Sequence, residues 1–146
     1  MVFEYVYLEN GYSHYGAKIP DIPVIYLAVK VGRFIARGPA IVDTGFDGGI
    51  YANMDIIRVL KGLKPSKVVE FEHPMFGVSE FEVYPAETHL YHRGKYVSIG
   101  VNNVYVPTEP ELITEEVLVG REVLNKLKIL LNPWRNIVVV EIKRNK

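Results

Sequence analysis

Short apolar runs separated by Gly- and Pro-containing turns divide this chain, and this pattern restricts it to a fold built mainly from strands. Val24–Val31 and Phe34–Val42 flank Gly32-Arg33, which predicts a β-hairpin. Gly38-Pro39 interrupts the second run, so we expect a bulge or a corner there. The 10 Tyr and 6 Phe residues, together with many Val and Ile, also favour strands.

The remaining segments follow the same pattern, with two helical intervals. Residues 53–63 carry apolar side chains at helical spacing, and Asn53 is suited to cap that helix. Residues 121–126 predict a second, short helix. Further strands are predicted at 2–8, 68–72, 80–90, 96–99, 101–106, 117–119, 129–131 and 137–142. We therefore predict a mainly β fold, a small closed or partly closed β-barrel with one or two short helices.

The bulk composition excludes several classes of function. Lys plus Arg and Asp plus Glu each total 17, so the chain has no net charge at neutral pH and no electrostatic footprint for nucleic acid. No apolar stretch approaches the roughly 20 residues that span a bilayer, and the first residues do not resemble a signal peptide. There are no cysteines, which excludes thiol catalysis and Cys-ligated zinc. We expect a single cytoplasmic domain over residues 1–146, with no cofactor, nucleic-acid partner or membrane contact.

The histidines do not predict a metal site. His89 and His92 lie three positions apart at the end of the predicted strand 80–90, and His14 and His73 are distant in sequence. Side chains at this separation on a strand point to opposite faces, so they are poorly placed to share a metal ion.

Asp43-Thr44-Gly45, directly behind the apolar run Ala40-Ile41-Val42, is the strongest functional signal. A carboxylate at the end of a buried strand is costly unless neighbouring groups satisfy it, so this position needs a physical reason. One such carboxylate can serve as a cap for the turn. Two of them, brought together across a dimer axis, would form an acid/base pair able to hydrolyse a peptide bond.

A second motif makes the chain similar to a known family. Leu118-Val119-Gly120-Arg121 precedes a short predicted helix, and together with Asp43-Thr44-Gly45 it resembles the two signatures of the retropepsin-like aspartic peptidases. The resemblance covers roughly residues 22–142, and residues 1–21 form an extra N-terminal segment without a counterpart. It implies one retropepsin-like acid-protease barrel that works as a homodimer, with one catalytic Asp in each chain.

The resemblance also implies roles for individual residues. Asp43 would be the catalytic carboxylate, Thr44 would hydrogen-bond across the twofold axis, and Gly45 would allow close approach of the backbone. Asp47 would accept a bidentate salt bridge from Arg121, because a planar guanidinium suits that geometry.

The same resemblance predicts the substrate-binding residues. They are Phe46, Asp47 and Gly48 beside the catalytic triplet, and Met75, Phe76 and Gly77 in a flap-like hairpin. Phe46 stands where the family usually has Ala or Ser, so its ring would either narrow a subsite or cover an apolar core. The flap segment 73–79 contains Pro74 and a single Gly, unlike the Gly-rich flaps of the viral enzymes.

Three interpretations follow from these motifs. The first is an aspartic endopeptidase that acts as a homodimer on a peptide or unfolded protein, through a water shared by two Asp43 side chains. The second is a catalytically inactive dimer of the same fold that binds a peptide or a partner protein. The third is a monomer in which Asp43 only caps its turn.

Overall fold

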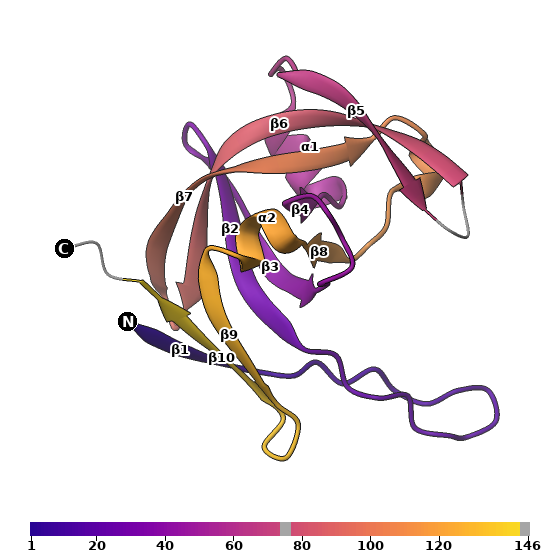
Figure 1. Cartoon of the computed structure of the whole chain (residues 1–146), viewed down its shortest axis with the longest axis vertical. Coiled ribbons are helices and arrows are strands. Elements are labelled where there is room, and N and C mark those ends of the chain that lie inside the picture. The colour runs from indigo at the N-terminus through magenta and orange to yellow at the C-terminus, as the bar shows by residue number, and fades with distance from the viewer. Residues whose placement is uncertain (74–76, 144–146) are drawn as a thin grey trace.

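The chain folds into a closed barrel with a small additional sheet, as Figure 1 shows. The computed structural model describes residues 1–73 and 77–143. Within those residues the helices are α1 (Met54–Leu60) and α2 (Arg121–Leu124), and η1 (Pro110–Leu112) is a short 3-10 helix. The strands are β1 (Val2–Val6), β2 (Val24–Val31), β3 (Phe34–Val42), β4 (Ile50–Tyr51), β5 (Lys67–His73), β6 (Gly77–His92), β7 (Lys95–Pro107), β8 (Val117–Val119), β9 (Leu127–Asn132) and β10 (Ile137–Ile142).

The barrel closes because β2 pairs with a strand on each of its sides. The strands follow the order β2-β3-β8-β4-β7-β6, and β6 returns to pair with β2 from Leu27↔Leu90 to Lys30↔Glu87. β5 pairs with β6 and extends beyond this ring as the outer strand of a hairpin. The predicted mainly β class, the closed barrel and the short helices are therefore confirmed.

Two parallel strands end together at one edge of the barrel. β3 and β8 run parallel in the register Ala40↔Val117 to Val42↔Val119. Because β3 and β8 end in register, the residues that follow them, Asp43 and Gly120, lie at neighbouring positions beyond the edge of the sheet. This register brings together the two sequence motifs, which are far apart along the chain.

The prediction of a bulge or a corner at Gly38-Pro39 is wrong. β2 and β3 pair without interruption from Val24↔Ile41 to Val31↔Phe34. β8 lies alongside β3 only from Ala40 onward, and a strand position with a partner on one side tolerates the missing N–H of proline. The register shift lies instead between Glu87 and His89, where β6 pairs with β7.

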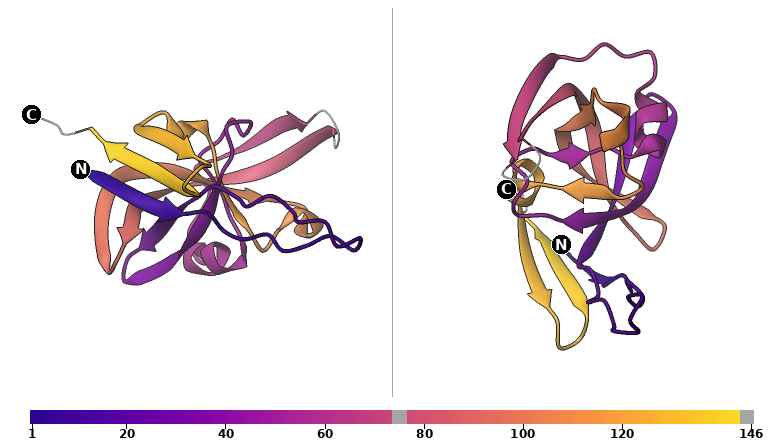
Figure 2. Two further views of the ribbon diagram at one scale, coloured as in Figure 1. Left: turned by 90° about the horizontal axis from the view of Figure 1, so that it is seen from below. Right: turned by 90° about the vertical axis from the view of Figure 1, so that its right-hand side faces the viewer.

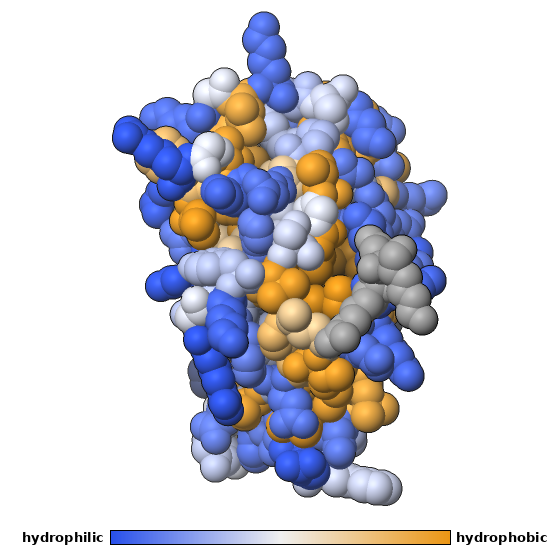
Figure 3. Space-filling view, turned by 90° about the vertical axis from the view of Figure 1, so that its left-hand side faces the viewer, coloured by the Kyte–Doolittle hydropathy of each residue, from blue (hydrophilic) through white to orange (hydrophobic). Residues whose placement is uncertain are grey.

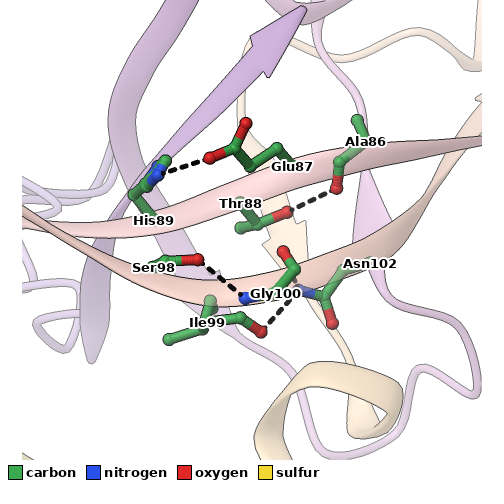
Figure 4. A network of polar contacts seen from close by, with 8 residues as sticks. All are labelled: Ala86, Glu87, Thr88, His89, Ser98, Ile99, Gly100 and Asn102. Carbon is green, nitrogen blue, oxygen red and sulfur yellow. Dashed lines mark hydrogen bonds and ion pairs between the residues drawn. The ribbon is translucent and has the colours of Figure 1, made fainter.

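Polar groups near this shift are satisfied within the hairpin, as Figure 4 shows. Thr88 is fully buried and its Oγ1 donates to the carbonyl of Ala86 at 3.2 Å. The buried Asn102 amide donates to the carbonyls of Ile99 and Gly100 at 3.3 and 3.4 Å. A bulge leaves ladder groups unpaired, and hydroxyl or amide side chains next to it limit the loss of hydrogen bonds.

Helix α1 begins where its sequence predicts. The Asn53 Oδ1 accepts a hydrogen bond from the N–H of Ile56 at 3.1 Å, which confirms the predicted cap. The Asn53 amide nitrogen also donates to the carbonyl of Glu115 at 3.1 Å and ties the helix to the segment before β8. The helix ends at Leu60, earlier than expected, since Gly62 adopts a left-handed φ of 94°.

Other boundaries also differ from the predictions. β7 unites the predicted strands 96–99 and 101–106, because Gly100 with its φ of 83° lies within one continuous strand. β5 and β6 reach further into the predicted loop 73–79, and their pairing extends to His73↔Gly77. η1 lies in the segment that joins β7 to β8.

The core fills the barrel and continues beneath the attached sheet. Its fully buried side chains include Ile25, Ile50, Leu90, Val104 and Val140. Burial of an aliphatic side chain of this size contributes roughly 1.5–3 kcal/mol relative to exposure. The core therefore joins barrel strands and β10 into one packed unit.

The extra N-terminal segment is tied to the C-terminal hairpin. β1 pairs with β10 from Val2↔Glu141 to Val6↔Ile137, and β10 pairs with β9, which gives the order β1-β10-β9. A bridge between Leu8 and Ile22 closes the base of a loop that extends away from the barrel in both views of Figure 2.

Apolar side chains also reach the surface. On the face turned to the viewer in Figure 3 they form a strip down the middle of the molecule. Exposed apolar residues of the attached sheet include Val2, Val6 and Leu130. Across residues 1–73 and 77–143, none of the helices has the length and apolar character needed to traverse a bilayer.

Replacing the cap of α1 tests how this helix is anchored. Asn53→Ala removes the bond to Ile56 and the bond to Glu115, so we expect the free energy of unfolding to fall by about 2 kcal/mol. Urea denaturation followed by circular dichroism measures this change. Asn10→Ala, at an exposed loop position, is the control and should change stability by less than about 0.5 kcal/mol. Equal stability of the two variants would contradict the anchoring role.

Candidate active site

Asp43 lies at the end of β3, in a turn that it helps to close. Its backbone N–H donates to the carbonyl of Val119 at 2.9 Å, which continues the contact between β3 and β8. Its Oδ1 accepts the N–H of Gly45 at 3.0 Å, and its carbonyl accepts the N–H of Phe46 at 3.2 Å. The side chain is half-buried, whereas Thr44 and Gly45 are exposed. The triplet is thus presented at the surface on a fixed turn.

Backbone hydrogen bonds join this turn to the start of α2. The N–H groups of Gly120, Arg121 and Glu122 donate to the carbonyls of Gly49, Phe46 and Gly48, at 2.7, 3.0 and 3.2 Å. The first N–H groups of a helix lack partners inside the helix, so these carbonyls satisfy them. We call residues 43–49 with residues 120–122 the loop–helix contact.

Gly120 permits the close approach of these two segments. A Cβ at this position would lie 2.3 Å from the carbonyl oxygen of Gly48 and 2.6 Å from that of Phe46. Carbon atoms do not approach oxygen this closely, so a side chain at position 120 would force the segments apart. The glycine of the second motif is therefore required by packing in this structure.

Arg121 adds side-chain contacts to the same region. One guanidinium nitrogen donates to the carbonyl of Thr44 at 2.8 Å, and the other forms an ion pair with Asp47. The predicted bidentate salt bridge would place both nitrogens on Asp47, but one of them donates to the Thr44 carbonyl instead. Both side chains are largely exposed, and exposed ion pairs contribute only about 0–1 kcal/mol.

The ring of Phe46 packs into an aromatic cluster. Its centroid lies 5.6 Å from that of Tyr105, 5.8 Å from Phe71 and 5.9 Å from Tyr51, each in an edge-to-face arrangement. Gly48 is buried beneath this ring, since a Cβ there would lie 2.6 Å from its Cζ atom. Of the two outcomes expected for Phe46, the ring covers an apolar core. A role for Phe46, Asp47 and Gly48 in substrate binding stays a prediction.

Glu122 forms contacts that the sequence analysis did not identify. Its carboxylate accepts hydrogen bonds from the hydroxyl of Tyr105 and, at 2.9 Å, from the amide of Asn103. Burial is the main cause that raises the pKa of Tyr105 above its ordinary value, so the hydroxyl remains a donor at neutral pH. Glu122 directly follows the second motif, but the amino-acid sequence alone does not indicate which strand this side chain faces.

The flap residues are described only in part. Met75 and Phe76 lie outside the residues that the structure describes, and Gly77 begins β6 with a φ of 73°. Phe71, on the β5 side of this hairpin, contacts Phe46 through their rings. The described part of the hairpin therefore contacts Phe46, the residue that follows Asp43-Thr44-Gly45.

The histidines lie in separate surroundings. The Nε2 atom of His89 is 3.1 Å from a carboxylate oxygen of Glu87, whereas the ring of His92 packs against Phe3 and Tyr5. For residues 1–73 and 77–143, the structure contains no group of three or more His, Asp or Glu side chains arranged to hold a metal ion.

The comparisons with known proteins yield one structural similarity. No protein-family model matches the chain, and no curated protein matches its sequence. Among solved structures, the chain is similar to a retropepsin-like aspartic protease from Rickettsia conorii, with 14% identity and a TM-score of 0.48. The alignment covers 94% of this chain and 98% of that chain. This similarity concerns the fold alone, and the description of the barrel rests on the strand pairing given above.

A pair of Gly→Ala substitutions tests the loop–helix contact. Gly120→Ala places a methyl group against two carbonyl oxygens, so we expect the free energy of unfolding to fall by about 1–3 kcal/mol. Gly38→Ala makes the same chemical change on β3, where a Cβ would meet no atom within 4 Å. The control should retain or increase stability, by up to about 1 kcal/mol, since Gly weakens a strand relative to Ala. Equal effects in urea denaturation would show that Gly120 is not required by packing.

Proposed function

We propose that this protein is an aspartic endopeptidase that hydrolyses peptide bonds as a homodimer, with one Asp43 from each chain. The observation that supports the proposal most is the presentation of Asp43. Its carboxylate is half-buried on a turn held by the loop–helix contact, and the neighbouring Thr44 and Gly45 are exposed. An acid/base residue needs such a fixed position with access to substrate.

The proposed chemistry depends on two like charges held close together. Two carboxylates about 3 Å apart do not both ionise, so the pair holds one proton. The ionised Asp43 takes a proton from a shared water, and the resulting hydroxide attacks the scissile carbonyl carbon. The protonated Asp43 of the second chain donates a hydrogen bond to the carbonyl oxygen and stabilises the tetrahedral intermediate. That intermediate breaks its C–N bond when a proton from the pair reaches the amine.

The dimer is part of this proposal, because each chain supplies one Asp43 turn. An isologous dimer places the same surface of both chains at a twofold axis, which suits a pair made of identical residues. Thr44 would brace the two turns across the axis, and Gly45 would admit the backbone of the partner or substrate. Asp47 and Arg121 would keep each turn in place.

The proposed substrate is a peptide or an unfolded protein in an extended conformation. It would lie between the Asp43 turns and the hairpins, in contact with Phe46, Asp47 and Gly48. The hairpin residues Met75, Phe76 and Gly77 would cover it from the other side.

A second function is favoured by one observation. The Phe46 ring contacts Phe71 of the hairpin, with 5.8 Å between centroids, so aromatic side chains occupy space beside the catalytic turn. A dimer with this arrangement could bind an extended peptide without cleaving it. This binding module is the alternative to the peptidase.

Asp43→Asn tests the proposed mechanism. We expect wild-type protein to cleave an unfolded protein at mildly acidic pH and the variant to lose at least about 10²–10⁴-fold in rate, because Asn cannot exchange the proton. Gel electrophoresis of the products measures cleavage, and analytical ultracentrifugation compares the oligomeric state. Asp55→Asn, at an exposed position on α1, is the control and should retain full activity.

Three other outcomes would contradict the proposed mechanism. Undiminished cleavage by Asp43→Asn would remove Asp43 from the mechanism. A wild-type dimer that binds extended peptides and cleaves none between acidic and neutral pH would select the binding module. A protein that stays monomeric at micromolar concentration would exclude the shared pair and leave Asp43 as a cap.

A further inference from the structure

A cavity lies on the side of the barrel covered by α1. Its volume is about 300 Å³, the space of roughly ten liquid water molecules and the lower end of the range for small-molecule sites. One wall is made of barrel and helix side chains that are largely buried, among them Leu27, Val29, Ile50 and Ile56. Glu115 and Glu116, which precede β8, also belong to the lining.

β3 has small residues beside the cavity, and two of them, Ala36 and Gly38, belong to its lining. Ala36, Gly38 and Ala40 alternate along the strand, and they pair with Val29, Leu27 and Ile25 of β2. At Gly38 an added Cβ would meet no atom within 4 Å. Protein interiors are normally close-packed, and a Gly within a strand reduces stability relative to Ala. Gly38 therefore leaves this space open, although Ala at the same position would stabilise the strand.

The opening of the cavity is acidic. Asp55, Glu115 and Glu116 belong to its lining, and Glu115 and Glu116 are exposed. Asp55 carries an ion pair with Arg58 at 3.2 Å, in which both side chains are largely exposed. These carboxylates give the opening a negative potential over an apolar interior.

The basic residue of the lining does not neutralise that potential inside the cavity. The guanidinium of Arg37 donates to the hydroxyl of Tyr96 at 2.5 Å, and it lies 4.8 Å from the ring centroid of Tyr91. These contacts hold the guanidinium against β6 and β7. Arg37 therefore belongs to the cavity lining, while its charged group contacts Tyr96 and Tyr91.

We propose that this cavity binds a small organic cation, with an apolar body in the hollow beside Gly38 and an ammonium group facing Glu115 and Glu116. Cation and apolar body are both required, because the hollow offers apolar contact and the opening offers negative charge. The proposal is independent of the proposed peptidase activity. It concerns a site formed by α1, β3 and the segment before β8, whereas Asp43 lies beyond the end of β3.

Three probes that share one apolar body test the charge requirement. Adamantylamine, adamantanol and adamantane carboxylate are titrated into the full-length ¹⁵N-labelled protein, and amide chemical shifts are followed by NMR. We expect saturable shifts at Gly38, Ile56 and Val117 with the amine, and at least about tenfold weaker binding of the carboxylate. Equal affinities for amine and carboxylate, or shifts confined to other parts of the chain, would overturn the proposal.

Two kinds of variant test the location. Glu115→Gln combined with Glu116→Gln should weaken amine binding about five- to tenfold and leave adamantanol binding unchanged, as expected for two exposed charges. Glu111→Gln, which removes an exposed carboxylate outside the lining, is the control and should bind like wild type. Unchanged amine binding by the double variant would overturn the assigned charge.

Gly38→Leu tests the hollow itself. Its side chain would fill the open space, so we expect binding of the amine and the alcohol to fall below detection while the circular dichroism spectrum stays native. Binding that survives in the folded variant would overturn the proposal. If this variant does not fold, Gly38→Ala, which adds one methyl group at the same position, must weaken amine binding at least about threefold.

Discussion

The loop–helix contact is the interaction on which the candidate site depends. β3 and β8 end in register, and from that edge the carbonyls of residues 46, 48 and 49 accept the N–H groups of residues 120–122. Each such bond contributes about 1 kcal/mol, and Gly120 lets the segments approach to a distance that no other residue allows. The exposed Asp47–Arg121 ion pair contributes less. The Asp43 turn is therefore positioned mainly by backbone packing and only secondarily by charge.

From this contact, two sets of interactions reach the rest of the barrel. Phe46 extends toward the hairpin, where Phe71 and Phe81 continue the aromatic cluster. Glu122 extends toward β7, where it binds Tyr105 and Asn103. Tyr105 also contacts Phe46, so the two sets meet in one side chain. The base of the hairpin is thereby fixed relative to the turn that carries Asp43.

Local chemistry made the β2–β3 hairpin and the Asn53 cap predictable, because each depends on residues that are neighbours in sequence. The proximity of Asp47 to Arg121 was predictable only through the resemblance of two separate motifs to one family. The hydrogen bonds of Glu122 and the hollow beside Gly38 were not predictable, because both depend on which elements become neighbours in space. Gly38-Pro39 was misread for the same reason, since a proline is tolerated where a strand has a partner on one side.

The pairing of β1 with β10 affects the order of folding. Phe3 pairs with Val140, so this sheet closes a very long loop. During synthesis, β1 leaves the ribosome long before β10 exists, and its apolar face stays without a partner until translation reaches the C-terminal hairpin. Contacts of such large sequence separation form slowly, which makes this sheet a late and aggregation-sensitive step of maturation.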